Sequence, residues 1–252
     1  MIALDKIKQF LWNFTLVKRI VTKTYNFLCI ITPVFDPAYD SINNLVAELQ
    51  SQTFGRFIHV MISNGPSPKI RDFVFELIKR DPRFIYVETN EEIIHNAPEL
   101  FINVCKRRNY GLKNFEAERY LFLDADAKLV DNSYFMKLHS AHQEINRDIL
   151  ITLVKIYDQN NEIILPKFPI KFGHIDLANF SVSKSIAKKF NYPTDHDANI
   201  GYGSDYRFFS LIATDNNTAL LNFISTIRDG NNTYKRLTEL LCEGNFERPD
   251  SK

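Results

Sequence analysis

One stretch of the chain reads Tyr120-Leu121-Phe122-Leu123-Asp124-Ala125-Asp126. Its first four residues are apolar or aromatic, which is typical of a strand that is covered on both faces of a parallel sheet. Two carboxylates then follow, one residue apart. In an open α/β sheet ligands bind beyond the carboxyl ends of the strands, and an Asp-x-Asp pair there supplies the oxygen ligands that hard divalent cations prefer. The alternative interpretation is a pair of solvated loop acids.

The chain before this stretch alternates short apolar runs with longer segments of helical periodicity. Predicted strands and helices follow one another in a β-α-β-α-β-α-β order, which indicates an α/β fold with an open, Rossmann-like, doubly wound and mostly parallel sheet. The predicted strands cover 27–35, 57–63, 84–88 and 120–123, and the predicted helices cover 39–52, 69–80 and 98–114.

The chain after Asp126 is less regular. We predict helices over 134–144, 184–190 and 205–214 and strands over 149–157, 162–165, 179–183 and 219–227, with a hairpin turn at 158–161. No internal repeat interrupts the pattern. The sequence therefore predicts a single domain over 25–252, with a nucleotide-binding half over 25–126 and a second half over 127–252.

Composition excludes several protein classes. Of the 252 residues 45% are hydrophobic and 24% are charged, which excludes disorder, collagen and coiled coil. The net charge of +1 gives no electrostatic sign of a nucleic-acid partner. The three cysteines are too few for a disulfide framework and indicate buried thiols in a reducing, cytoplasmic compartment. No apolar run approaches the ~20 residues that a membrane span needs.

Residues 1–24 differ from the rest. They hold five basic residues and one acid, and their apolar residues recur at helical spacing, which predicts an amphipathic N-terminal helix. Two interpretations stay open. Residues 4–23 lie on the inner face of the cell membrane as a peripheral anchor, or the apolar stripe packs on the domain or on a partner subunit. The stripe consists of Leu4, Ile7, Leu11, Phe14, Val17 and Val21.

Four motifs in order resemble the family 2 glycosyltransferases of the GT-A fold. The resemblance covers about residues 27–210 and includes the opening Asp-x-Asp stretch. The other motifs are Ile31-Thr32-Pro33-Val34-Phe35, Leu49-Gln50-Ser51-Gln52-Thr53-Phe54 and Cys105-Lys106-Arg107-Arg108-Asn109-Tyr110-Gly111.

The resemblance implies a metal-dependent inverting glycosyltransferase of the hexosyltransferase type. Such an enzyme moves a sugar from a nucleoside diphosphate sugar, with a UDP-sugar favoured, to an acceptor hydroxyl. It implies Mn²⁺ or Mg²⁺ as cofactor and a glycan or lipid-linked sugar as acceptor, in polysaccharide biosynthesis at the cell surface. Residues 127–252 would then form the acceptor side.

The resemblance also assigns residues to the donor site. Asp126, together with Asp124, would hold the metal, and Asp124 would also contact the ribose. Arg108 would lie near the donor, although a surface position on its helix is the alternative. The nucleoside pocket would be shaped by Thr32, Pro33 and Phe35.

Two motifs depart from the family pattern. The second strand ends without the usual acid, and Asn64 stands where it could hydrogen-bond a uracil edge. In Gly201-Tyr202-Gly203-Ser204-Asp205 the second acid is present, and Asp205 is the expected catalytic base, while Ser204 replaces the first acid. The alternative is that Ser204 or Asp205 caps the helix. Whether His174 or His196 joins the metal site is left open.

Other functions are weighed against this one. A catalytically inactive GT-A scaffold that binds a nucleotide sugar stays possible because of the missing acids. A phosphotransferase of the haloacid dehalogenase type is disfavoured, because its Asp-x-Asp belongs on the first strand and not on the fourth. A nucleotidyltransferase would have a Gly-rich loop after the first strand, and residues 32–39 contain no glycine.

Overall fold

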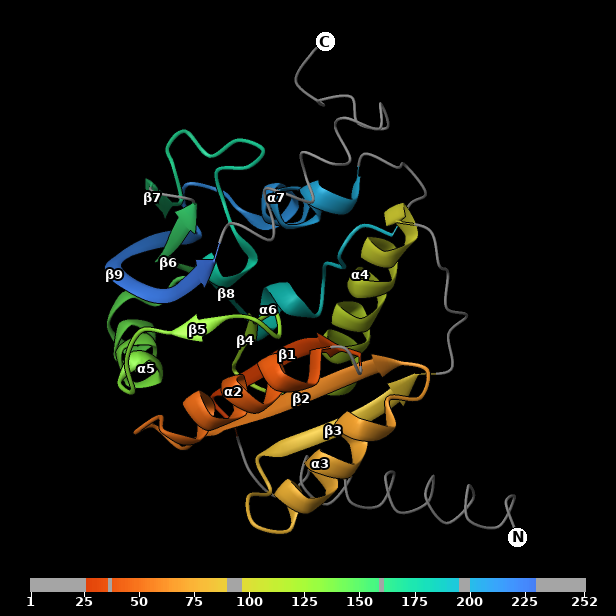
Figure 1. The fold of residues 1–252 in the computed structure, drawn as a ribbon. Helices are drawn as coiled ribbons and strands as arrows, with labels where there is room; N and C mark the ends of the chain where they lie inside the picture. The colour runs from red at the N-terminus through yellow and green to blue at the C-terminus, as the bar shows by residue number, and fades with distance from the viewer. Residues whose placement is uncertain (1–25, 36–37, 90–96, 159–160, 195–199, 230–252) are drawn as a thin grey trace, which may run out of the picture.

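The computed structural model describes residues 26–35, 38–89, 97–158, 161–194 and 200–229. The predicted N-terminal helix over 1–24 lies outside the described residues, as do His196 and Cys242. The described chain forms one sheet of nine strands in the order β3-β2-β1-β4-β8-β6-β9-β5, with β7 paired to β6. The arrangement is shown in Figure 1.

The strands and helices follow the predicted order closely. The strands are β1 (Leu28–Val34), β2 (Phe57–Asn64), β3 (Phe84–Thr89), β4 (Arg119–Phe122), β5 (Lys128–Leu129), β6 (Ile149–Asp158), β7 (Asn161–Leu165), β8 (Phe180–Ser183) and β9 (Thr218–Asp229). The helices are α2 (Tyr39–Gln50), α3 (Pro68–Ile78), α4 (Ala97–Asn114), α5 (Tyr134–Ile145), α6 (Lys184–Ala187) and α7 (Ile200–Ile212), with a 3-10 turn η2 (Leu177–Asn179).

Most strands point the same way, as predicted. β1 runs parallel to β2 and to β4, and β2 runs parallel to β3. β8 is antiparallel to both β4 and β6, so β6 points in the direction of β4, and β9 is parallel to β6. The carboxyl ends of β1, β2, β3, β4, β6 and β9 therefore share one edge of the sheet.

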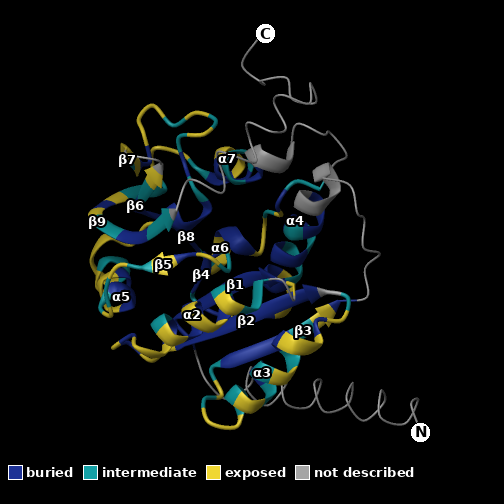
Figure 2. Ribbon diagram, viewed as in Figure 1, coloured by how far each residue is buried: buried dark blue, intermediate teal, exposed yellow. Residues whose placement is uncertain are grey.

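Helices cover both faces of the sheet. On one face α2, α3 and α5 share an apolar core with the strands, and on the other face α4 packs against β1 and β2, while α6 and α7 pack nearer β4 and β8. The central strands are consequently buried along their length (Figure 2). This two-sided burial explains why β4 is apolar or aromatic from Tyr120 to Phe122, after the buried and hydrogen-bonded Arg119 at its start, and why the carboxylates stand only beyond its end.

The structure differs from the prediction in three details. α7 begins at Ile200, so Ser204 and Asp205 lie inside the helix and neither caps it. The predicted helix over 184–190 is one turn, α6, and the two-residue strand β5 was not predicted.

The prediction of buried thiols is confirmed for the two cysteines that the structure describes, because Cys29 and Cys105 are free and buried. In the described ranges no helix combines the length and the apolar character that crossing a membrane requires.

Candidate functional site

Two strands far apart in sequence bring charged side chains to the same edge of the sheet. β4 ends at Phe122, and Asp124 follows two residues later. Arg228 is the penultimate residue of β9. Because β4 and β9 point the same way, both residues lie at the carboxyl edge, where open α/β sheets bind ligands.

Asp124 is held by two arginines. Arg108 on α4 donates from Nη2 to Asp124 Oδ1 at 2.9 Å. Arg228 donates from Nη2 to Asp124 Oδ2 at 2.8 Å. Each carboxylate oxygen therefore already accepts one charge-assisted hydrogen bond.

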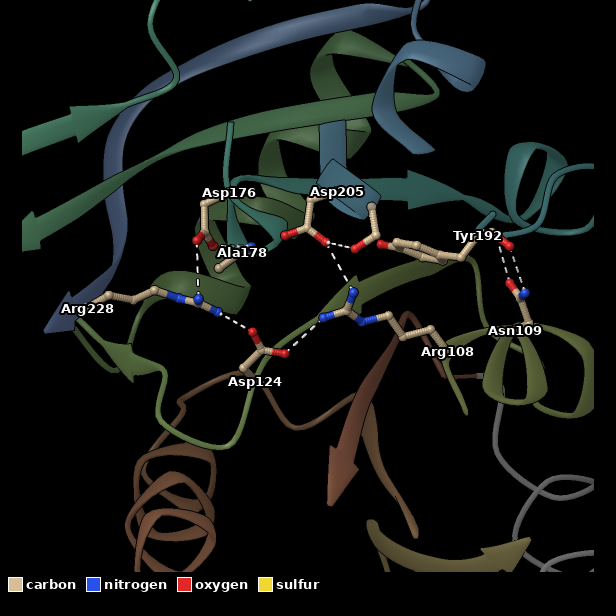
Figure 3. A network of polar contacts seen from close by, with 9 residues as sticks. Arg108, Asn109, Asp124, Asp176, Ala178, Tyr192, Asp205 and Arg228 are labelled. Atoms are coloured by element: carbon tan, nitrogen blue, oxygen red, sulfur yellow. Dashed lines mark hydrogen bonds and ion pairs between the residues drawn. The ribbon is translucent and has the colours of Figure 1, made fainter. Parts of the chain in front are cut away.

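Each arginine reaches a second carboxylate, so that five charged residues form a chain (Figure 3). Arg108 Nη1 donates to Asp205 Oδ1 at 3.1 Å. Arg228 Nη1 lies 3.2 Å from Asp176 Oδ2. Asp176 is fixed in turn, because its side chain caps η2 by accepting from the backbone N–H of Ala178 at 2.9 Å.

Arg108 is a buried residue of the site. Its side chain is 4% exposed, and its guanidinium lies over the ring of Tyr192 at 5.2 Å from the centroid. Although burial opposes its charge, the carboxylates of Asp205 and Asp124 raise its pKa above the ordinary value. The alternative of a surface position on the helix is therefore wrong.

The carboxylates of the chain differ in proton affinity. Desolvation alone would raise the pKa of Asp124, but Arg228 and Arg108 outweigh it and lower that pKa to about 2. For Asp205 desolvation dominates over the attraction of Arg108, and the nearby charges of Asp176 and Asp124 add to it, so the pKa rises to about 6. Asp124 is therefore firmly ionised, whereas Asp205 exchanges its proton close to neutral pH.

Asp126 is the exposed carboxylate of the pair. It forms no ion pair with any residue in the described part of the chain. Desolvation in this acidic surrounding raises its pKa, Asp124 and Asp176 add to that effect, and Arg228 opposes it. Asp126 is thus the carboxylate of the motif whose oxygens are available to a ligand.

The described residues contain no group of three His, Cys, Asp or Glu side chains that would hold a metal ion by themselves. Mg²⁺ in particular is often held by one or two carboxylates together with substrate phosphates. Asp126 suits that mode of binding, since its carboxylate is free. Asp124 could bind a metal ion only after one of its two ion pairs with arginine had broken.

The predicted nucleoside residues lie at or near the ends of the first two strands. Thr32 is fully buried, and its hydroxyl is 2.9 Å from Nε2 of His59, whose pKa burial lowers to about 3. Pro33 is buried and Phe35 is 54% exposed. Asn64 is the last residue of β2, and its side chain lies outside the described part of the structure. Their contact with a nucleoside stays a prediction.

Neighbouring side chains order the site. Asn109 uses its whole amide on one backbone segment, accepting from Tyr192 N at 2.7 Å and donating to Tyr192 O at 3.0 Å. Ser204 Oγ is 3.4 Å from Asp205 Oδ1. His174 is half-buried, with Nδ1 at 2.9 Å from Pro169 O, and no described contact joins it to the Asp-x-Asp pair.

The sequence interpretation did not include Arg228 and Asp176 among the site residues. The signal for Asp176 was present, because it stands in a segment, 175–180, that is similar to an acceptor-side motif of the resembled family. The signal for Arg228 was weaker. It was only a basic residue at the end of an apolar strand.

The charges of the cluster do not balance. Asp124, Asp126, Asp176 and Asp205 face two guanidinium groups, so the cluster carries two net negative charges when all are ionised. An incoming diphosphate would meet this net charge, and a divalent cation would cancel it.

The sequence matches no protein-family model and no curated protein. The fold, by contrast, is similar to solved glycosyltransferase structures. Residues 1–349 of S. aureus TarS in complex with UDP align with a TM-score of 0.64 at 15% identity, over 81% of this chain and 60% of that one. The complex of the same fragment with UDP-GlcNAc aligns with a TM-score of 0.62 at 15% identity, over 81% and 58%.

A second protein has the same fold. The mannosyltransferase PcManGT from Pyrobaculum calidifontis, in complex with GDP-Man and Mn²⁺, aligns with a TM-score of 0.55 at 11% identity, over 86% of this chain and 63% of that one. The chain thus spans about three fifths of the length of these structures. The likeness establishes the fold, which is of the GT-A type.

Proposed function

We propose that this chain is a metal-dependent inverting glycosyltransferase of family 2. It transfers a hexosyl group from a nucleoside diphosphate sugar, with a UDP-sugar favoured, to the hydroxyl of a glycan or lipid-linked acceptor. The observation that carries the proposal is the chain of ion pairs from Asp205 through Arg108 to Asp124, beside the free carboxylate of Asp126, on a GT-A fold.

The related structures support the donor class. TarS was crystallised with UDP and with UDP-GlcNAc, and PcManGT with GDP-Man and Mn²⁺. All three ligands are nucleoside diphosphates or their sugars, which need a site that accepts a diphosphate. From the sequence resemblance we assign the chain to polysaccharide biosynthesis for the cell surface, and from its few, buried cysteines we assign it to the cytoplasm.

The imbalance of charge supports a role for a divalent cation. Asp126 would hold it, and Asp124 is the second candidate once an arginine turns toward the phosphates. Bound there with the donor, Mn²⁺ or Mg²⁺ would neutralise the negative charge that grows on the departing diphosphate. Arg108, which is buried, and Arg228, which is mostly buried, supply the remaining positive charge from within the site.

Asp205 has the properties of a general base. Its pKa of about 6 keeps it mostly ionised at neutral pH and still basic enough to accept a proton from an attacking hydroxyl. Its side chain is 24% exposed, and Arg108 holds it in place. An inverting transfer needs one such base on the acceptor side of the sugar.

The nucleoside would lie against the ends of β1 and β2. Pro33 and Phe35 would form its apolar wall, and Asn64 would contact the base. Thr32 would contribute to the pocket by supporting its floor, since its hydroxyl is paired with His59 inside the core and is not free to bind the nucleoside.

Calorimetric titration of UDP, GDP and dTDP, each with and without Mn²⁺, tests the proposal. We expect one nucleotide to bind in the presence of the metal and its affinity to fall at least about tenfold in Asp126→Ala. Asp215→Ala is the matched control, because that carboxylate is exposed in the turn before β9, at the opposite edge of the sheet from the carboxyl ends. If no nucleotide binds with or without metal, the proposal fails.

The inactive scaffold is the second candidate, and the replacement of an acid by Ser204 favours it. Asp205→Asn separates the two. An enzyme loses sugar transfer in this variant and keeps donor binding. A scaffold shows no transfer or donor hydrolysis before or after the change.

A further inference from the structure

Asn103 on α4 is a buried polar side chain whose amide is unpaired among the residues that the structure describes. Its exposed fraction is 1%, and neither its Oδ1 nor its Nδ2 has a hydrogen-bond partner in that part of the chain. Buried amides in folded proteins are nearly always hydrogen-bonded, because an unpaired one loses its water without compensation. Asn179 shows the usual outcome in this chain, since its Nδ2 donates to the carbonyls of Thr152 and Leu165 at 2.8 and 3.0 Å.

The helix places Asn103 beyond the end of β1. Residues four apart share one face of a helix, so Asn103 lies in line with Arg107 and Gly111. Gly111 packs against Ile31 in the middle of β1, and Arg107 Nη1 donates to Val34 O, at the last residue of β1, at 3.3 Å. Asn103 precedes Arg107 by four residues, about 6 Å along the helix axis, and therefore lies beyond the end of that strand. In Figure 1 the lower end of α4 meets β1 and β2.

The face of α4 decides which part of a donor Asn103 would meet. Arg108, on the neighbouring face, points to Asp124 and Asp205, where the diphosphate is proposed to bind. Asn103 and Arg107 lie instead toward β1, where the nucleoside is proposed to bind. The two ends of the donor thus correspond to two faces of one helix.

The hydrogen-bonding groups of the Asn103 amide also suit a nucleoside better than a phosphate as its partner. Asn103 offers one acceptor and one donor group, whereas a phosphate offers acceptors alone and would leave Oδ1 unpaired. A nucleobase edge such as that of uracil or guanine has an N–H beside a carbonyl, and a ribose hydroxyl both donates and accepts. Either would satisfy the whole amide.

We propose that Asn103 binds the nucleoside of the donor through hydrogen bonds from both ends of its side-chain amide. The inference rests on the proposed function and adds a specificity residue to it. Both amide atoms are enclosed in the ligand-free chain, so they gain their partners only when the nucleotide enters and the end of β1 adjusts around it.

The test compares UDP with inorganic pyrophosphate, each titrated with Mg²⁺ into the wild-type chain, Asn103→Leu and Asn103→Ala. Leucine has nearly the shape of asparagine and removes the unpaired amide, so the melting temperature of Asn103→Leu should stay unchanged or rise. Its affinity for UDP should fall about tenfold, as expected for two lost neutral hydrogen bonds, while pyrophosphate binding is kept. Asn109→Leu is the stability control, because its paired amide should cost melting temperature.

Two further ligands distinguish the partner group. If Asn103 binds the base, the wild type discriminates between UDP and CDP and both variants lose that discrimination. If it binds the ribose, the wild type prefers UDP to 2′-deoxy-UDP and the variants lose that preference. Either result supports the inference.

Three results overturn it. UDP affinity that is unchanged in both variants shows that the amide meets no nucleoside. A loss of melting temperature together with equal losses for UDP and pyrophosphate shows a structural role. If the wild type binds pyrophosphate and no nucleotide, or binds neither, the proposed function fails and this inference fails with it, whereas the first two results leave the proposed function intact.

Discussion

Asp124 and Arg228 are separated by 104 residues in sequence and form a 2.8 Å ion pair at the carboxyl edge of the sheet. The pair joins the Asp-x-Asp motif after β4 to the last described strand, β9. Because Arg228 also pairs with Asp176, and Asp124 also pairs with Arg108, removing one member changes the charge that the others feel. The proposed donor side and the proposed base are therefore electrostatically connected.

Arg228→Ala should lower kcat/KM for sugar transfer by about 100-fold, the loss typical of removing one fixed donor that stabilises developing charge. The cluster would gain one net negative charge and Asp124 would lose one of its two arginines, so the variant should bind the divalent cation more tightly and need less of it for half-maximal activity. Steady-state kinetics over a Mn²⁺ series measures both effects. Arg80→Ala, at an exposed position after α3, is the control. Activity that is equal in the Arg228 variant and the control would contradict the role of Arg228.

The activity of the wild type should rise with pH through about 6, because Asp205 must be ionised to accept a proton. Below that value log kcat/KM should fall with a slope of about one. The stability contributed by Asp205 changes in the opposite sense. Its folded pKa is above the ordinary 3.8, so the folded chain binds more protons between these values and loses stability as pH rises from about 4 to about 6.

Asp205→Asn separates these two trends. The variant should lose transfer activity at every pH while its melting temperature no longer decreases across that interval. Thermal unfolding of both chains between pH 4 and 7 measures the difference. Identical pH profiles of melting temperature would show that Asp205 titrates with an ordinary pKa.

The fold was largely predictable because its signals are local. The apolar run from Tyr120 to Leu123 predicted a central strand, observed as β4, and the periodicity of residues 98–114 predicted α4 within one residue. The start of α7 was predicted late because Gly201 and Gly203 lower helix propensity. Packing at the other end of that helix, where Phe208 stacks on Tyr192 at 4.0 Å, contributes stability that no local pattern shows.

The site was predictable only in part. Asp124, Asp126, Arg108 and Asp205 stand in recognisable motifs, and the structure brings three of them into one ion-pair chain. The contact of Arg228 depends on the path of β9 through the whole sheet. A sequence pattern likewise cannot show that the amide of Asn103 is left unpaired, since this depends on every side chain packed around it.

Residues 1–24 offer a prediction about the membrane. If they form an amphipathic surface helix, the full chain should sediment with vesicles that contain anionic phosphatidylglycerol and not with neutral phosphatidylcholine vesicles, and salt should weaken the binding. A double change within the apolar stripe, Leu11→Ser with Phe14→Ser, should abolish sedimentation. Binding that is absent in the wild type would favour the alternative, in which the stripe packs on protein.

Gly111 is expected to be required for the close approach of α4 to β1. A Cβ atom there would lie 2.7 Å from Cδ1 of Ile31 and 2.9 Å from its Cγ1 and Cγ2, and a β-branched side chain in a strand has little freedom to yield. Gly111→Ala should therefore destabilise the fold by about 1–3 kcal/mol, in spite of the better helix propensity of alanine. Gly55→Ala is the matched control. A Cβ atom there would have only Arg83 Nη1 within 4 Å, at 4.0 Å, so this change should be neutral or slightly stabilising.

Urea unfolding of the two variants measures the difference in their free energies of unfolding. An equal stability would mean that α4 shifts at no cost, and the positions of Arg107, Arg108 and Asn103 along it would then be less fixed than the structure indicates.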